Sequence, residues 1–248
     1  MTDLETTKLF EYHKKNAHME EFAGYEMPIS YTNIADEHMV VRNSVGIFDV
    51  SHMGRIEIQG ENAQETVDLV IPSDIKIVEK NNAIYTTLCN DNGGIIDDLI
   101  IYKKNEKEFL LIVNAINVKK DIKWIEKNKT EAATSIENIT NQTSMIAIQG
   151  PNSKNVLDEV LKKNVKINRF EFFEETKYGN IIISRTGYTG EDGYELIIFD
   201  NEKIMQIWNE FLQTNLKFGL RPCGLGARDT LRIEAGFPIY GKEIHEEI

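Results

Sequence analysis

A turn-rich pentapeptide, Asn90–Gly94 (NDNGG), constrains the fold more than any other segment of this chain. Apolar runs that favour β-strands flank it on both sides, at Ala83–Leu88 and Ile95–Tyr102. Asn, Asp and Gly readily adopt the backbone angles that tight hairpin turns need. A second Gly-rich loop, Thr186–Gly193, also separates two strand-like runs. Two hairpins require antiparallel pairing, so we expect an α+β fold and not a doubly wound parallel sheet.

The remaining elements are predicted from the spacing of apolar residues. Alternating or short apolar runs predict further strands at Arg55–Gln59, Phe109–Val113, Met145–Gln149, Asn180–Arg185 and Tyr194–Phe199. Apolar residues at three- and four-residue steps predict helices at Leu4–Lys15, Asp36–Asn43, Asn62–Val70, Val118–Asn128, Ser153–Leu161, Glu202–Gln213 and Gly226–Glu234. No repeat or Pro/Ser-rich linker interrupts the chain, so we expect any domains to be closely joined.

Composition limits the classes of protein to which the chain can belong. Its 248 residues, 41% of them hydrophobic, suffice for one large domain or two modest ones. The 40 acidic and 28 basic residues give a net charge of -12, which repels phosphate backbones and argues against nucleic-acid binding. No run approaches the ~20 apolar residues of a membrane span. The N-terminal segment has no apolar signal core, so we expect a cytoplasmic protein without a membrane partner.

The metal-ligating residue types show no metal-binding pattern. Cys89 and Cys223 are far apart and lack ligand spacing, so neither a disulfide nor a zinc site is expected. The histidines also lack metal spacing and are expected on the surface or in the core; they are His13, His18, His38, His52 and His245. We therefore predict no metal centre.

Two adjacent carboxylates, Asp97 and Asp98, follow the first hairpin turn. Side chains alternate between the faces of a strand, so we expect the two to point in opposite directions and not to act as a pair. At most one of them would line a pocket. Asp is costly to bury in an apolar strand unless it has a partner or a role. The alternative is a plain hairpin in which both side chains bond loop amides.

The second loop, Thr186–Glu195, combines glycines with aromatic and acidic residues. It is not a phosphate loop, because it lacks the Gly-Lys-Ser/Thr ending and precedes a strand. From these residues alone, the loop could be either a ligand-binding segment or a long hairpin without further function.

The segment Pro222–Gly241 begins with glycines and continues into a predicted helix. Arg228 and Arg232 stand four residues apart, which places them on one face of that helix. An Arg among small residues often serves a planar partner, because its forked guanidinium matches carboxylates and carbonyls. The alternative is a solvated ion pair between Arg228 and Asp229 that contributes little. Gly236 suits the C-terminal turn of the helix.

Taken together, these segments resemble the T-protein family of the glycine cleavage system, the tetrahydrofolate-dependent aminomethyltransferases. The resemblance runs along essentially the whole chain in the order that the family has. It rests on FAGYEMP from Phe22, VGIFDVSHM from Val45, GGIIDDLI from Gly93, IQGP from Ile148, TGYTGEDGYE from Thr186 and CGLGARDTLRIEAG from Cys223.

The resemblance implies two intertwined α+β domains, with antiparallel sheets and helices, from a three-domain cloverleaf. Residues 1–51 and 140–248 would form the first domain, and residues 52–139 an inserted second domain. The family's third domain, a small C-terminal β-barrel, would be missing from this chain.

The resemblance also implies a reaction and a set of site residues. An aminomethyl group on the dihydrolipoyl arm of the glycine cleavage H-protein would give its carbon to tetrahydrofolate, with release of ammonia. Asp97 would be the catalytic carboxylate that faces the folate amines. Glu195 would accept hydrogens from the pterin ring, and Arg228 would also bind folate. The other predicted folate contacts are Asn114, Tyr188, Met53, Tyr85 and Tyr240.

Three other interpretations remain open at this stage. A related folate-dependent demethylase would share the folate pocket and differ on the donor side. A folded fragment with impaired catalysis would still bind folate. A non-catalytic folate-binding module is disfavoured, because its Lys-Gly-Cys-Tyr-x-Gly-Gln signature is absent around Ile239–Glu243.

Overall fold

The computed structural model describes residues 4–130 and 134–247, which form two compact units. Unit 1 runs to His52 and includes Gln142–Phe237, whereas unit 2 consists of Met53–Asn141 and the segment that begins at Pro238. The sequence-based division instead places the segment after Phe237 in the first domain. It groups with unit 2 because the Ile95 amide donates to the His245 carbonyl at 3.3 Å. Residues 1–3, 131–133 and 248, which the predicted domain ranges include, lie outside the described residues.

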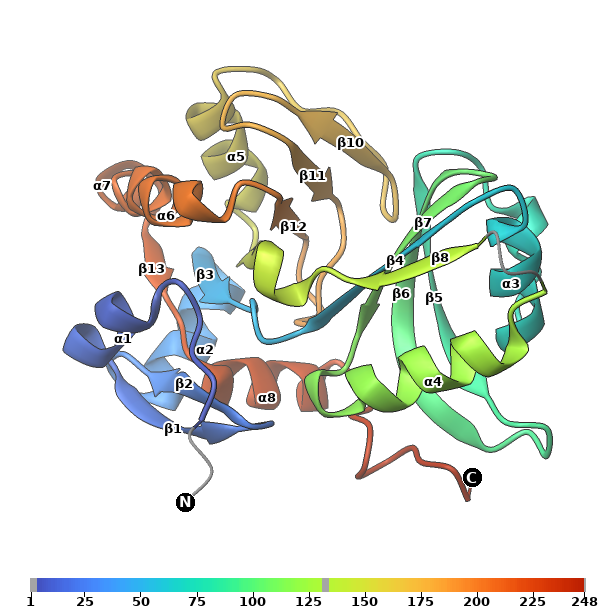
Figure 1. The fold of residues 1–248 in the computed structure, drawn as a ribbon. Coiled ribbons are helices and arrows are strands. Elements are labelled where there is room, and N and C mark those ends of the chain that lie inside the picture. Colours follow the sequence, from blue (N-terminus) through green and yellow to red (C-terminus); the bar gives the residue numbers. More distant parts are fainter. Residues whose placement is uncertain (1–3, 131–133, 248) are drawn as a thin grey trace. The chain divides into compact units, whose positions relative to one another are not determined.

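Unit 1 contains a six-stranded sheet with the order β10-β11-β12-β9-β3-β13 in its described residues (Figure 1). Every neighbouring pair is antiparallel except β13 and β3, which are parallel. The strands are β3 (Val45–Asp49), β9 (Ser144–Gln149), β10 (Phe172–Glu175), β11 (Ile181–Ser184), β12 (Gly193–Ile198) and β13 (Leu220–Pro222). Strands β3, β9, β11 and β12 are buried along their whole length, so both faces of the sheet are covered.

The core of unit 1 contains the fully buried Trp208, and helices connect the strands of its sheet. They are α1 (Phe10–Asn16), α2 (Ile34–Asn43), α5 (Ser153–Leu161), α6 (Ile204–Leu212), α7 (Asn215–Phe218), α8 (Leu225–Glu234) and the 3-10 turn η4 (Asn201–Lys203). A separate hairpin joins β1 (His18–Phe22) to β2 (Tyr25–Ser30). Helix α8 ends in a turn at Gly236, whose φ of 75° is the left-handed conformation that glycine allows.

Unit 2 contains a five-stranded antiparallel sheet with the order β5-β6-β7-β4-β8 in its described residues (Figure 1). The strands are β4 (Gly54–Gln59), β5 (Asn82–Cys89), β6 (Ile95–Asn105), β7 (Glu108–Val113) and β8 (Ser135–Asn138). Helices α3 (Ala63–Val70) and α4 (Val118–Asn128) pack Val67 and Ile125 into its core. The 3-10 turns are η1 (Ile75–Ile77), η2 (Ala115–Asn117) and η3 (Thr140–Gln142).

The structure confirms the α+β fold and the hairpin at NDNGG. The Asn90 amide donates to the Gly94 carbonyl at 2.9 Å, and Gly93 has a φ of 87°. The first helix begins at Phe10, later than the predicted Leu4. Both cysteines are free, and Cys223 is buried.

None of the helices in residues 4–130 and 134–247 is long and apolar enough to cross a membrane. The same part of the chain holds no group of three or more His, Cys, Asp or Glu side chains that could bind a metal ion.

Candidate functional site

Glu195 places a buried carboxylate in the sheet of unit 1. It lies on β12 opposite Ser184 of β11 and is 4% exposed. The Thr186 hydroxyl donates to its Oε2 at 2.5 Å, and the Ser184 hydroxyl lies 2.7 Å from the Thr186 hydroxyl. A carboxylate can accept more hydrogen bonds than the one that Thr186 donates, so Glu195 can also accept hydrogens from a ligand.

Arg228 brings a cation to the same group of residues. Its guanidinium carbon lies 4.7 Å from the centre of the Tyr188 ring, a distance typical of a cation–π contact. Burial lowers the pKa of Arg228, and the negative charge of Glu195 opposes that shift. Its Nη1 atom is buried and has no hydrogen-bond partner among the described residues. A buried donor without a partner is costly, so this nitrogen is suited to bind a ligand acceptor.

Two aromatic rings complete this part of unit 1. The ring of Tyr188 stacks on that of Phe237, with centroids 5.7 Å apart and planes at 20°. Tyr188 therefore contacts both Arg228 and Phe237, and the charge of Glu195 acts on Arg228. Stacked rings offer a flat surface to a planar ligand.

Gln149 fixes the loop between β11 and β12. Its Nε2 donates to the Thr186 carbonyl at 3.1 Å, and its Oε1 accepts from the Thr189 hydroxyl at 2.9 Å. A Cβ at Gly187 or at Gly193 would lie within 2.3 Å of the Gln149 side chain. These two positions therefore need glycine for close packing against Gln149.

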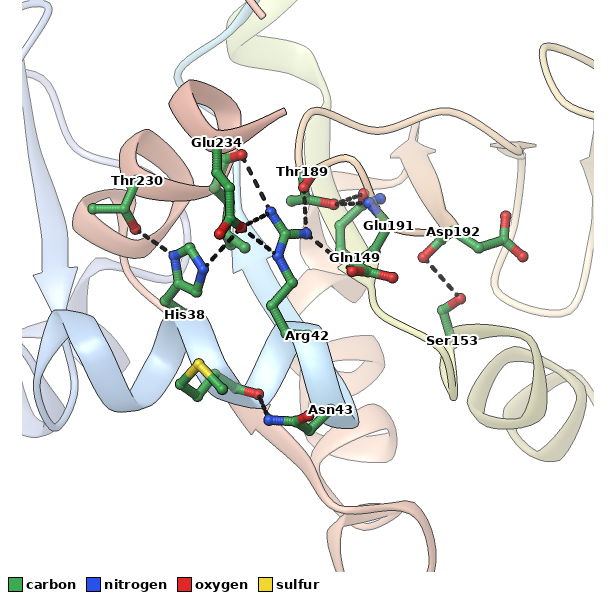
Figure 2. A network of polar contacts seen from close by, with 12 residues as sticks. His38, Arg42, Asn43, Gln149, Ser153, Thr189, Glu191, Asp192, Thr230 and Glu234 are labelled. Atoms are coloured by element: carbon green, nitrogen blue, oxygen red, sulfur yellow. Dashed lines mark hydrogen bonds and ion pairs between the residues drawn. The ribbon is translucent and has the colours of Figure 1, made fainter. Parts of the chain in front are cut away.

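Arg42 of α2 ties the same loop to the C-terminal turn of α8 (Figure 2). Its Nη1 donates to the Thr189 carbonyl at 2.6 Å and pairs with Glu191 at 3.1 Å. Its Nε donates to Glu234 at 2.7 Å. His38, one turn earlier on α2, contacts Glu234 at 3.2 Å and the Thr230 hydroxyl at 2.9 Å. Arg42 thus connects the loop, which carries Tyr188, to α8, which carries Arg228.

In unit 2, Asp97 lies at the start of β6 and is 0% exposed. Its Oδ2 accepts a hydrogen bond from the backbone amide of Asn114 at 3.0 Å, and its Oδ1 accepts one from the Asn114 side chain at 2.8 Å. The Asn117 side chain donates to Oδ1 at 2.6 Å. Burial raises the pKa of Asp97, although these donors oppose the shift. The segment after β7 therefore holds this carboxylate in one orientation.

Asp98 shares a partner with Asp97. The Asn114 side chain also donates to Asp98 Oδ1 at 2.8 Å, and the Tyr85 hydroxyl donates to Asp98 Oδ2 at 2.9 Å. The Asn114 side-chain nitrogen therefore links the two carboxylates, and the expectation that they do not act as a pair stays a prediction. Burial raises the pKa of Asp98 as well.

Two other predicted residues of unit 2 have different partners. Tyr240 accepts a hydrogen bond from Lys120 at 2.7 Å, and Lys120 lies 4.3 Å from the Tyr240 ring centre. The Met53 carbonyl accepts from Arg55 at 2.5 Å. The roles of Tyr240 and Met53 in folate binding stay predictions.

The structure therefore gathers the predicted residues into two clusters. Glu195, Arg228 and Tyr188 lie together in unit 1, and Asp97, Asn114 and Tyr85 are linked in unit 2. The alternative ion pair between Arg228 and Asp229 is wrong, since Asp229 pairs with Arg232 at 2.8 Å. Sequence reasoning missed Thr186, Phe237 and Asn117, and also Asp121, a buried carboxyl group on α4. Asn117 and Asp121 follow Asn114 at steps of three and four residues, and this spacing could have indicated both of them.

Comparisons with known proteins agree on one family. Residues 9–248 match the GCVT N-terminal domain family. The chain is 43% identical to the aminomethyltransferase of Thermoanaerobacter sp. (strain X514) over 252 aligned residues, which cover 100% of this chain and 68% of that protein. It is 41% identical to the aminomethyltransferase of Alkaliphilus oremlandii, with the same coverage of 100% and 68%.

A solved structure shares the fold. The glycine cleavage system aminomethyltransferase T of Bartonella henselae superposes with a TM-score of 0.90 at 31% identity. The match covers 98% of this chain and 65% of that one. The chain thus spans about two thirds of the length of the relatives that it matches.

Proposed function

The chain belongs to the GCVT family of glycine cleavage aminomethyltransferases, and from this membership we propose that it transfers a one-carbon unit to tetrahydrofolate. The donor is an aminomethyl group on the dihydrolipoyl arm of the H-protein. The carbon loses its bonds to sulfur and to the amine nitrogen and forms two bonds to folate amines. The two hydrogens that folate gives up leave with ammonia and with the thiol, so the reaction balances without an oxidant.

The observation that carries the proposal is the cluster of Glu195, Arg228 and Tyr188 in unit 1. A pterin ring is planar and carries adjacent N–H donors beside a carbonyl. A carboxylate accepts two parallel N–H donors well, and the free Nη1 of Arg228 can donate to a carbonyl. The stacked pair of Tyr188 and Phe237 supplies a flat surface. This set of groups therefore suits a pterin better than it suits a phosphate or a metal ion.

Asp97 of unit 2 is the carboxylate that we assign to the chemistry. A positive charge develops on a folate amine as it attacks the carbon, and a fixed carboxylate stabilises that charge. Asn114 and Asn117 hold the Asp97 oxygens with three N–H donors, so little reorganisation is needed during the reaction. Such assistance is typically worth about 10²- to 10⁴-fold in rate.

The remaining assignments belong to the same proposal. Asn114, Tyr85, Met53 and Tyr240 are proposed as further folate contacts. The lipoylated H-protein is the proposed protein partner, and the cytoplasm is the proposed location. Neither nucleic acid nor membrane takes part.

Release of ammonia from aminomethylated H-protein tests this function directly. We expect release by the purified chain to depend on tetrahydrofolate and to follow the formation of methylene-tetrahydrofolate one to one. Unmodified H-protein is the control and should give no ammonia. Release at the same rate without folate would refute the proposed reaction. Methyl-tetrahydrofolate formed from a methylated amine or sulfonium donor, with no ammonia released from H-protein, would point to the demethylase instead.

A further inference from the structure

A second buried carboxyl group, that of Asp121 on α4, lies against Asp97. The Asp121 side chain is 0% exposed. Neither of its oxygens accepts a hydrogen bond from an N–H or O–H donor of the described residues. The carboxyl group of Asp97 lies within hydrogen-bonding reach of it. Two carboxyl groups can share a hydrogen bond only if one of them carries a proton.

The donors around the pair decide which group carries that proton. Asp97 accepts N–H bonds from the Asn114 amide and from the side chains of Asn114 and Asn117. Such bonds stabilise the ionised form of a carboxyl group. Asp121 receives none of them, and an ionised carboxylate buried without donors costs several kcal/mol. The charge therefore belongs on Asp97 and the proton on Asp121.

The charged groups on the surrounding elements agree with this assignment. Burial and then the charge of Asp97 raise the pKa of Asp121, and Asp98 adds to the shift. Lys120, its neighbour on α4, opposes the shift, but its amine is bound by Tyr240 and Glu246. On β4, which also packs against α4, the Arg55 guanidinium donates to the carbonyls of Met53 and Thr140.

We propose that Asp121 is a positioning residue that keeps its proton at neutral pH and donates its O–H group to Asp97. The pair then carries a single negative charge, and that charge is located on Asp97. Asp121 on α4 completes a set of four donors around the Asp97 oxygens, of which Asn114, between β7 and η2, gives two and Asn117 of η2 gives one. The protonation is a property of this chain, whereas its consequence for turnover rests on the proposed function.

Infrared spectroscopy and unfolding measurements test the protonation without any substrate. We expect a carboxylic-acid C=O band at pH 8 in the native protein, which is lost in Asp121→Asn and retained in Glu126→Gln, a matched change on the same helix. The unfolding equilibrium constant of the wild type, divided by that of Asp121→Asn, gives a ratio that isolates the effect of Asp121. This ratio should rise about tenfold per pH unit between pH 5 and 8. The reason is that only the unfolded wild type releases the Asp121 proton. An absent acid band, or a ratio that does not change with pH, would overturn the proposal.

Turnover separates a positioning role from a purely structural one. The amide of Asp121→Asn still offers an N–H donor to Asp97, so we expect its kcat to stay within about threefold of wild type. Asp121→Ala offers no donor and should lose about tenfold or more in kcat, the worth of one charged hydrogen bond, at unchanged folate affinity. Equal kcat values for the two variants would contradict the positioning role. If the wild type also gave no turnover, the proposed function would fail, while the infrared result would still decide the protonation.

Discussion

At the scale of single residues, unit 1 contains a buried carboxylate, Asp49, that several hydrogen bonds stabilise in its ionised form. Asp49 accepts hydrogen bonds from His13 at 2.9 Å, from the Thr7 hydroxyl at 2.7 Å and from the Ser51 amide at 2.9 Å. The other ring nitrogen of His13 lies 2.7 Å from the Tyr31 hydroxyl. Burial alone would raise the pKa of Asp49, but these partners lower it to about 2.

Because its pKa is lower in the folded state, Asp49 stabilises the protein above pH ~4, and this contribution is lost as the pH falls towards 2. We expect Asp49→Asn to lower the free energy of unfolding by roughly 2 kcal/mol at pH 7. The difference from wild type should vanish near pH 2. Urea unfolding at both pH values measures it, and the partly exposed Asp192→Asn serves as the control. A difference of the same size at both pH values would show that the charge of Asp49 is not the cause.

Asp97 is the residue whose replacement tests the assigned chemistry. In Asp97→Asn the volume is kept but the charge is lost, so a developing positive charge on folate is no longer stabilised. We expect kcat to fall about 10²- to 10⁴-fold while the dissociation constant of folate changes little. Single-turnover kinetics and a folate titration give the two numbers separately. A collapse of folate affinity at unchanged kcat would make Asp97 a binding residue instead.

The role of a side chain could be predicted from the sequence only where it did not depend on partners far away along the chain. The motif GGIIDDLI pointed to Asp97, but its pairing with Asp121 joins residues 24 positions apart on two elements. The same holds for Arg42, whose partners Thr189 and Glu234 lie 147 and 192 residues away. Spacing along one helix or strand does not report such contacts.

At the scale of elements, Arg42 connects three parts of unit 1 (Figure 2). It is 18% exposed and reaches the loop after β11 and the end of α8 from α2. We expect Arg42→Ala to speed hydrogen exchange in the loop 187–192 by roughly tenfold or more, because the charged bond to the Thr189 carbonyl is lost. The exposed Arg221→Ala is the matched control and should leave the loop unchanged. Equal exchange in both variants would mean that Gln149 alone holds the loop.

The hairpins show which elements a sequence can predict. NDNGG was confirmed as a turn because its residue types favour the required backbone angles. The turn between β1 and β2 was missed because Ala23, at a φ of 53°, occupies a position where Asn or Gly is usual. Strand β3 was also missed, since all five of its residues are buried and no alternation marks it.

At the scale of the whole molecule, the family relationship extends beyond any single motif. The fold superposes on the Bartonella henselae enzyme with a TM-score of 0.90, although only 31% of the residues are identical. The six motifs noted in the sequence lie in both units, so each unit contributes residues to the proposal. Because the chain spans about two thirds of its relatives' length, its own capacity to bind folate is the property to measure.

A calorimetric titration of tetrahydrofolate into the purified chain measures that capacity. We expect saturable binding that Glu195→Ala weakens by roughly 1.5 to 3 kcal/mol, the usual worth of a charge-assisted hydrogen bond. Glu174→Ala, an exposed glutamate in the same sheet, should bind like the wild type. The absence of binding to the wild type, or an unchanged dissociation constant in Glu195→Ala, would contradict the proposed folate site.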